Sequence, residues 1–302
     1  MDFSAVAVTA KIAWPSANST ASVTRKLAEK VITGRDTFLN LENSAQRNNV
    51  FSNAMDAAEY TNIAALEREH WYYSGKRQFV RAWIRQARPP QRDDTLLDCG
   101  AGTGLFAEEM SADCRVLVLD DHEEALRILR TRFNPEQILS LAGDRVPLPD
   151  GSLEYVTALD VLEHVPDDAA VVQGLHRLLK PGGLAVVTVP ASMALWSDWD
   201  VALHHFRRYD RAQLRALFGD DQWELVYVNY TNVLVYPLVW AVRRWRALGQ
   251  RLGWNPPASR TEDRQPARPI NTLLRAQFVS LAHWRVPFPF GVSLVLVARR
   301  RG

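Results

Sequence analysis

The segment "LLDCGAGTG", residues 96–104, constrains the fold of this 302-residue chain more than any other. In it an apolar run meets a carboxylate and then three glycines within five residues. A strand that ends in glycines and opens into a helix brings free backbone N–H groups close to a ligand, because glycine has no side chain in the way and adopts unusual dihedral angles. The pattern alone is also compatible with a dinucleotide site, since Asp120 follows the first glycine by about 20 residues, where a nucleotide ribose is bound.

Short apolar segments alternate with amphipathic ones from residue 93 onward. The predicted strands are 95–99, 115–120, 137–143, 153–160, 183–190, 223–230 and 292–300. The predicted helices between them are 104–110, 123–133, 167–180 and 238–252. Strands separated by helices predict an α/β fold, with a mostly parallel sheet that is covered on both faces and connected by right-handed crossovers.

Three regions are predicted along the chain. Residues 1–24 have neither a continuous apolar core nor a basic start, which predicts a flexible extension and not a secretory signal. Residues 25–92 are predicted to be a helical entry region, because apolar and aromatic residues recur at roughly helical intervals until Pro89 and Pro90. Residues 93–302 are predicted to form the main domain, with a basic helical insertion at about 231–290 that is too long for an ordinary connection.

Charge is distributed unevenly around a net value of +2. Residues 241–302 hold twelve arginines against Glu262 and Asp263, a local charge of +10, so the first 240 residues carry −8. Such asymmetry indicates an anionic partner, either a nucleic acid or a membrane surface, or simply a solvated basic face. A nucleic-acid partner is not expected, because the arginines are scattered and no nucleic-acid-binding module is recognisable.

The sequence predicts neither a membrane-spanning helix nor a disulfide framework. The longest strongly apolar run, residues 233–242, has ten residues and contains Pro237, whereas a spanning helix needs about 20. The two cysteines, Cys99 and Cys114, suit a reducing cytoplasm. We therefore expect a cytoplasmic protein, with peripheral membrane contact through residues 231–252 left open.

Asp98 lies directly before the glycine turn, where a carboxylate repels a pyrophosphate but attracts an ammonium or a sulfonium group. This favours a cationic ligand over a dinucleotide. The chain then presents, in order, "LLDCGAGTGLFAEEM", "VLVLDD", "AGD", "LEYVTALDVLEHVPDD" and "LLKPGGLAVVTVP". This ordered set, over about residues 94–190, resembles the successive motifs of class I S-adenosylmethionine-dependent methyltransferases.

The resemblance implies a fold and a cofactor site. The fold is a Rossmann-like, doubly wound sheet of seven strands, mostly parallel, in which the last strand inserts antiparallel between the fifth and the sixth. Asp98 would interact with the amino group of S-adenosylmethionine, and Asp120 would accept both ribose hydroxyls. The other cofactor-binding residues that the motifs imply are Gly100, Ala101, Gly102 and Gly104 in the loop, Asp121 beside the adenosine, Asp144 and Arg145 at the adenine edge, and Asp160 at the end of the fourth strand.

Methyl transfer to a hydroxyl requires loss of a proton, which calls for a base or for a metal that stabilises the oxyanion. Asp160, Glu163 and His164 form a pattern similar to the metal-binding signature of ubiquinone-pathway O-methyltransferases and of small-RNA 3′-terminal 2′-O-methyltransferases. His204 or His205, which follow the fifth strand, would complete such a site. We predict Glu163, His164 and His205 as the catalytic residues without a metal. A divalent ion on Asp160, Glu163, His164 and His205 stays an alternative, as does a structural role.

Two further groups of residues are candidates for acceptor binding. Trp71, Tyr72 and Tyr73 offer an aromatic wall, and the region before the first strand often covers the active site in the family that the chain resembles. Arg207, Arg208 and Tyr209 could clamp an anionic acceptor, because arginine is a bidentate donor to carboxylate and phosphate.

The predicted function is S-adenosylmethionine-dependent methyl transfer to a small hydrophobic or aromatic acceptor, by O-methylation in secondary or specialised metabolism. One alternative is methylation of a lipid- or polyprenyl-linked acceptor at the membrane face. Others are a nucleic-acid methyltransferase and a non-catalytic cofactor-binding protein. The oligomeric state is left open.

Overall fold

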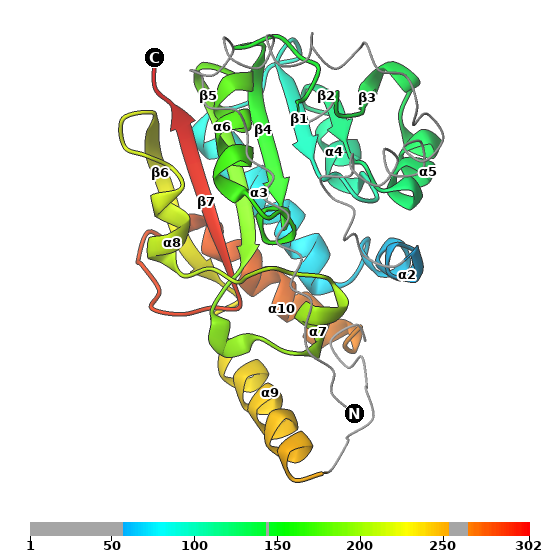
Figure 1. Cartoon of the computed structure of the whole chain (residues 1–302), viewed down its shortest axis with the longest axis vertical. Coiled ribbons are helices and arrows are strands. Elements are labelled where there is room, and N and C mark those ends of the chain that lie inside the picture. The colour runs from blue at the N-terminus through cyan, green and yellow to red at the C-terminus, as the bar shows by residue number, and fades with distance from the viewer. Residues whose placement is uncertain (1–56, 143–144, 254–264) are drawn as a thin grey trace, which may run out of the picture. The chain divides into compact units, whose positions relative to one another are not determined.

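The computed structural model describes residues 57–142, 145–253 and 265–302 (Figure 1). Their strands form one seven-stranded sheet in the order β3-β2-β1-β4-β5-β7-β6. The strands from β3 to β5 are parallel, whereas β7 runs antiparallel to both β5 and β6. The predicted insertion of an antiparallel last strand between the fifth and the sixth is therefore confirmed.

The elements have the following bounds. The strands are β1 (Thr95–Cys99), β2 (Arg115–Leu119), β3 (Ile138–Leu139), β4 (Leu153–Leu159), β5 (Leu179–Pro190), β6 (Trp223–Thr231) and β7 (Ser293–Arg300). The α-helices are α2 (Ala57–Leu66), α3 (Trp71–Ala87), α4 (Leu105–Met110), α5 (Glu123–Arg132), α6 (Asp168–Leu178), α7 (Asp198–Ala202), α8 (Arg211–Ala216), α9 (Tyr236–Arg251) and α10 (Arg268–Ser280). Short 3₁₀ turns include η2 (Leu162–His164) and η3 (Met193–Leu195).

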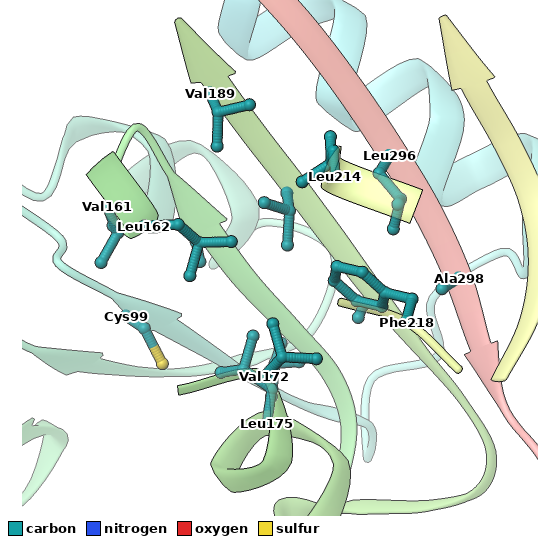
Figure 2. Close-up of a cluster of buried hydrophobic side chains, with 14 of the residues drawn as sticks. Cys99, Val161, Leu162, Val172, Leu175, Val189, Leu214, Phe218, Leu296 and Ala298 are labelled. Carbon is teal, nitrogen blue, oxygen red and sulfur yellow. The ribbon is translucent and has the colours of Figure 1, made fainter. Parts of the chain in front are cut away.

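Helices cover both faces of the sheet and bury two apolar clusters. On one face, α6 and α8 cover β4, β5 and β7, and Figure 2 shows one cluster that includes Val172 and Leu175 of α6, Phe218, which follows α8, and Leu296 of β7. On the other face, α3, α4 and α10 pack against the sheet through residues such as Phe79. Two covered faces explain why the strands are nearly continuous apolar runs.

Helix α3 packs closely on α10 because a glycine lies at the contact. A Cβ at Gly75 would come within 2.8 Å of the Phe278 ring, so a larger residue would separate the two helices. The helix begins after His70, whose side chain caps it, and ends at Ala87, before the two prolines that predicted its end. The predicted helical region is interrupted, because residues 67–70 break it into α2 and α3.

The third strand is shorter than predicted. We expected residues 137–143, but β3 contains only Ile138 and Leu139. These two residues pair with Val118 and Leu119, and Leu119 is the last residue of β2, so the sheet edge offers no further partner.

The six strands β1 to β6 end at one edge of the sheet, and β7 begins there. In Figure 1 this edge faces α7, α9 and α10, and α9 extends away from the sheet beyond it. The residues that follow β1, β2, β4, β5 and β6 are therefore gathered along one line, where open α/β sheets bind their ligands. No helix among the described residues has both the length and the apolar content needed to cross a membrane.

Candidate active site

A cavity of about 580 Å³ lies at the carboxyl edge of the sheet. Its walls come from the residues that follow β1, β2, β4, β5 and β6, together with α3, α9 and α10. It brings together most residues predicted from the sequence. These are Trp71, Tyr72, Tyr73, Asp98, Gly100, Ala101, Gly102, Asp120, Asp121, Asp160, Glu163, His164, His205 and Arg208.

The glycine loop is built as its sequence predicts. Gly100, Gly102 and Gly104 all have positive φ, at 67°, 57° and 77°. The N–H groups of Gly100 and Ala101 donate to the Leu119 carbonyl, which ties the loop to the end of β2. A Cβ at Gly102 would meet nothing within 4 Å, so this glycine borders open space and a ligand can approach its backbone closely.

Gly104 has a packing role. It caps the N-terminus of α4 and does not line the cavity. A Cβ there would lie 2.6 Å from both Leu129 and Phe133, so glycine is required for the contact between α4 and α5.

One end of the cavity is acidic. Asp120 accepts hydrogen bonds from the N–H groups of Gly102 (2.8 Å) and His122 (3.0 Å), which fixes its carboxylate at the loop. Asp98 accepts a hydrogen bond from the Thr157 hydroxyl at 2.6 Å. Burial raises the pKa of Asp98 to about 7, and the nearby Asp120 adds to this rise. A cationic ligand would relieve both effects.

Only Arg145 of the two residues predicted at the adenine edge lies within the described part of the chain. Asp144 lies outside the described residues. Arg145 does not line the cavity; it is exposed and forms a 3.1 Å ion pair with Asp150.

Asp160 is engaged by an α3 residue that the sequence analysis missed. Its carboxylate forms an ion pair with Lys76 and accepts a 2.8 Å hydrogen bond from Thr188. Burial acts to raise the pKa of Asp160, but the charge of Lys76 and these hydrogen bonds outweigh it, so the pKa is lowered. Asp160 is therefore ionised and neutralised by Lys76 in the middle of the cavity.

Glu163 and His164 are held in their uncharged forms. Glu163 is 1% exposed, and its carboxylate accepts no hydrogen bond from another described residue. Burial, together with the charge of Asp160, raises its pKa well above the ordinary value. Burial and the neighbouring His205 lower the pKa of His164 to about 4. At neutral pH His164 thus presents a neutral imidazole, beside a Glu163 carboxyl whose protonated form is favoured by burial.

His205 is oriented by a buried carboxylate. Its Nδ1 lies 2.9 Å from Asp200, which is fully buried and also accepts a 2.6 Å hydrogen bond from Arg208. Because an ionised carboxylate only accepts, this contact places a proton on Nδ1 and leaves Nε2 as the basic nitrogen of a neutral His205. The rings of His205 and His164 meet edge to face at 4.7 Å.

A metal ion would find three donors here. One ligand atom from each of Glu163, His164 and His205 lies within 4.8 Å of the others. One carboxylate and two imidazoles are a donor set that zinc, iron and manganese accept, and the Asp200–His205 contact resembles the carboxylate that supports a ligating histidine. Asp160, the fourth candidate ligand, is occupied by Lys76.

The remaining predicted acceptor residues divide into two groups. Trp71, Tyr72 and Tyr73 line the cavity at the start of α3. Arg207 and Tyr209 do not line it, because both are held by Asp168 at 2.8 Å, next to the turn that carries Glu163.

Sequence reasoning missed Lys76, Asp200 and Asn232. Lys76 is one turn of α3 from Tyr72 and shares its face, so helical spacing could have found it. Asp200 lies five residues before His205, a short separation across a turn. Asn232 directly follows β6 and had no motif to mark it.

The proteins to which this chain is similar in sequence agree with the function that the cavity suggests. A family model described as a methyltransferase domain matches residues 70–228, more than half of the chain. The ubiquinone biosynthesis O-methyltransferase of Thiobacillus denitrificans is 31% identical over 142 residues, which cover 43% of this chain and 61% of that protein. A Mycolicibacterium smegmatis relative, named as a probable S-adenosylmethionine-dependent methyltransferase, is 29% identical over 55% of this chain and 64% of its own. The chain thus spans less than two thirds of the length of either relative.

A solved structure shares the fold over most of the chain. It is a chain of the complex between the Haloferax volcanii Trm112 methyltransferase activator and a methyltransferase, with a TM-score of 0.53, 18% identity, and coverage of 85% of this chain and 98% of that one. At this identity the likeness concerns the fold alone. The family match spans the glycine loop, the acidic end of the cavity and the His205 region, so the chain belongs to the class I S-adenosylmethionine-dependent methyltransferases.

Proposed function

We propose that the chain transfers the methyl group of S-adenosylmethionine to a hydroxyl oxygen of a small hydrophobic or aromatic acceptor. The observation that carries the proposal is one continuous cavity with two chemically different ends. The end at β1 and β2 is acidic and suits a cationic cofactor, and the end at β4 and β5 holds His205, oriented by Asp200, beside Glu163 and His164.

At the cofactor end, each residue has a distinct role. Asp98 binds the cofactor's amino group, and Asp120 binds the ribose hydroxyls. Gly102 allows the cofactor to approach the loop, since the space beside it is open. Asp121 borders the adenosine, and Tyr60 adds an apolar wall where its ring stacks on His122 at 4.6 Å.

At the acceptor end, His205 acts as the base. When bound, the cofactor supplies an electrophilic methyl group, so the acceptor needs alignment and removal of one proton. The basic Nε2 of His205 takes the proton from the hydroxyl, and Asp200 holds the imidazole and stabilises the charge that forms. Glu163 and His164 hydrogen-bond and position the acceptor oxygen.

Isotope transfer tests this proposal. Purified protein is incubated with methyl-labelled S-adenosylmethionine and an extract of its native host, and aqueous, nucleic-acid and organic fractions are separated before mass spectrometry. Label in an organic-phase metabolite is the expected result. Label confined to nucleic acid would assign a different substrate class, and no label despite binding of S-adenosylhomocysteine would indicate a non-catalytic cofactor-binding protein.

The base mechanism predicts full activity in excess chelator. A divalent ion held by Glu163, His164 and His205 would instead stabilise the deprotonated acceptor. The ion pair of Asp160 with Lys76 withholds one carboxylate and places a cation near Glu163, which disfavours a metal. We expect kcat to stay within about twofold after dialysis against EDTA, with no increase on adding Mg²⁺, Mn²⁺ or Zn²⁺. Loss of activity that a single ion restores would assign the metal.

A second candidate function is methylation of a lipid-linked acceptor at a membrane face. The observation that favours it is an exposed apolar and basic surface around α9, a helix without acidic residues. Its exposed apolar residues, with those of the neighbouring segments, are Leu234, Leu238, Trp240, Trp245, Leu248, Leu252, Ile270 and Leu273. Arg244 and Arg251 are exposed beside them. Leu238 also lines the cavity, so this surface adjoins the acceptor end.

Vesicle flotation tests the second candidate. It predicts that the protein floats with phosphatidylglycerol vesicles at low salt and that Trp240→Ser with Leu248→Ser reduces binding by about tenfold or more. Val286→Ser is the matched control, since Val286 is also 60% exposed but lies outside α9 and α10, where its carbonyl accepts a hydrogen bond from Asn229 of β6. If wild-type protein does not bind at low salt, the second candidate is removed and the small-molecule acceptor stays.

A further inference from the structure

The side chain of Asn232 is buried and has no hydrogen-bond partner in the described part of the chain. It is 1% exposed, and neither its side-chain oxygen nor its side-chain nitrogen makes a hydrogen bond with any described residue. It lines the cavity directly after β6. Burying an amide without hydrogen bonds costs free energy, so such groups are rare and mark places where something else supplies the bonds.

Only one other buried side chain in the described part of the chain leaves two terminal polar atoms without a partner. It is Glu163, which lines the same cavity. The carboxyl of Glu163 can accept hydrogen bonds, and the amide of Asn232 can both donate and accept them. The cavity therefore contains two separate polar groups that are available to hydrogen-bond a ligand.

The sheet sets the separation of these two groups. Glu163 follows β4 and Asn232 follows β6, and β5 and β7 lie between these strands. The carboxyl-terminal ends of β4 and β6 are three strand spacings apart, which is roughly 14 Å. The cofactor end, at β1 and β2, lies on the opposite side of β4, so Asn232 is at the far end of the acceptor region.

The α9 side of the cavity is mainly apolar, and the one cation among its described residues, Arg243, donates a hydrogen bond to the Leu195 carbonyl. Val235, Leu238 and Val239 of the α9 region and Leu274 of α10 line the cavity. Ser293, opposite Thr231 in the sheet, also lines it, but its hydroxyl already lies 3.4 Å from that of Tyr72. The far end thus suits an apolar molecule that carries one hydrogen-bonding group.

We infer that Asn232 binds a second polar group of the acceptor, at the end opposite the oxygen that is methylated. The inference rests on the proposed function and narrows its substrate class. The acceptor is an elongated apolar molecule, longer than a single ring, with a hydroxyl at one end and a group that both donates and accepts hydrogen bonds, such as an amide, at the other.

Backbone conformation alone also explains an asparagine here, because Asn232 has a φ of 57°, which asparagine and glycine tolerate. Asn232→Gly separates the two explanations, since it keeps this conformation and removes the amide. Ser192→Gly is the matched control. Ser192 also has positive φ, at 62°, but does not line the cavity.

The test uses two biphenyl compounds that differ in one group. Binding of 4-phenylphenol and of 4′-hydroxybiphenyl-4-carboxamide to the S-adenosylhomocysteine complex is measured by calorimetry. Wild-type protein and Ser192→Gly are expected to bind the carboxamide about tenfold more tightly than 4-phenylphenol. Asn232→Gly is expected to lose this preference while its affinity for 4-phenylphenol stays within about twofold.

Three results would overturn the inference: equal binding of the two compounds by wild-type protein, an unchanged preference in Asn232→Gly, or no binding of either compound. Methylation of both compounds by the wild type is measured separately. A protein that shows the binding preference but methylates neither compound would contradict the proposed function and leave the Asn232 subsite standing.

Discussion

Replacing His205 with asparagine is expected to lower kcat by about 10³-fold, the usual scale for loss of a general base. Asparagine retains a donor near the position of Nδ1, so it can still bond to Asp200, but it lacks the basic Nε2. The binding of S-adenosylhomocysteine should stay within about twofold, because His205 is at the acceptor end. Single-turnover kinetics with saturating cofactor measures the change in the chemical step.

His204→Asn is the matched control for this variant. His204 is exposed and does not line the cavity, and its φ of 55° is compatible with asparagine. We expect its kcat to be within about twofold of the wild type. If His205→Asn has the same small effect, His205 is not the base. A 10³-fold loss in His164→Phe alone, about the full scale of general-base catalysis, would assign that role to His164.

The affinity for S-adenosylhomocysteine is expected to weaken as pH falls below 7. Burial and Asp120 raise the pKa of Asp98 to about 7 in the free protein, and the ammonium group of the ligand binds the ionised form. Below pH 7 the carboxyl is protonated in the free protein, so binding must release a proton. For a single group of this pKa, the dissociation constant should rise about fifteenfold between pH 7 and pH 5.5.

Calorimetry in buffers of different ionisation enthalpy measures this proton release directly. Asp98→Asn should bind more weakly at pH 8 and lose most of the dependence on pH. Burial also raises the pKa of Asp120, so a residual dependence at the acidic end of the range is expected. A dissociation constant that does not change between pH 7 and pH 5.5 would contradict the role of Asp98.

The strand pattern and the glycine loop were sufficient to predict the sheet and the acidic end of the cavity. Apolar runs bounded by helices fix a parallel sheet, and Asp98 and Asp120 lie at strand ends, where local sequence determines position. The short β3 was not predicted, because its length is set by where its partner β2 ends.

The acceptor end depends on contacts between distant segments. Lys76 meets Asp160 across 84 positions of the chain, and no local pattern encodes such a pair. Arg208 was predicted to clamp an anion but donates to the buried Asp200, eight residues before it. Asn232 is assigned a function because no described residue bonds to its side chain, a property that only the folded structure shows.

The most direct test of methyl transfer to oxygen is the ¹³C NMR spectrum of the product made by the wild-type protein from S-adenosylmethionine with a ¹³C-labelled methyl group. If the acceptor hydroxyl is methylated, the labelled carbon is expected to resonate as a methoxy group on an apolar product. A labelled carbon bonded to nitrogen or to carbon would contradict hydroxyl methylation and the role of His205 as its base.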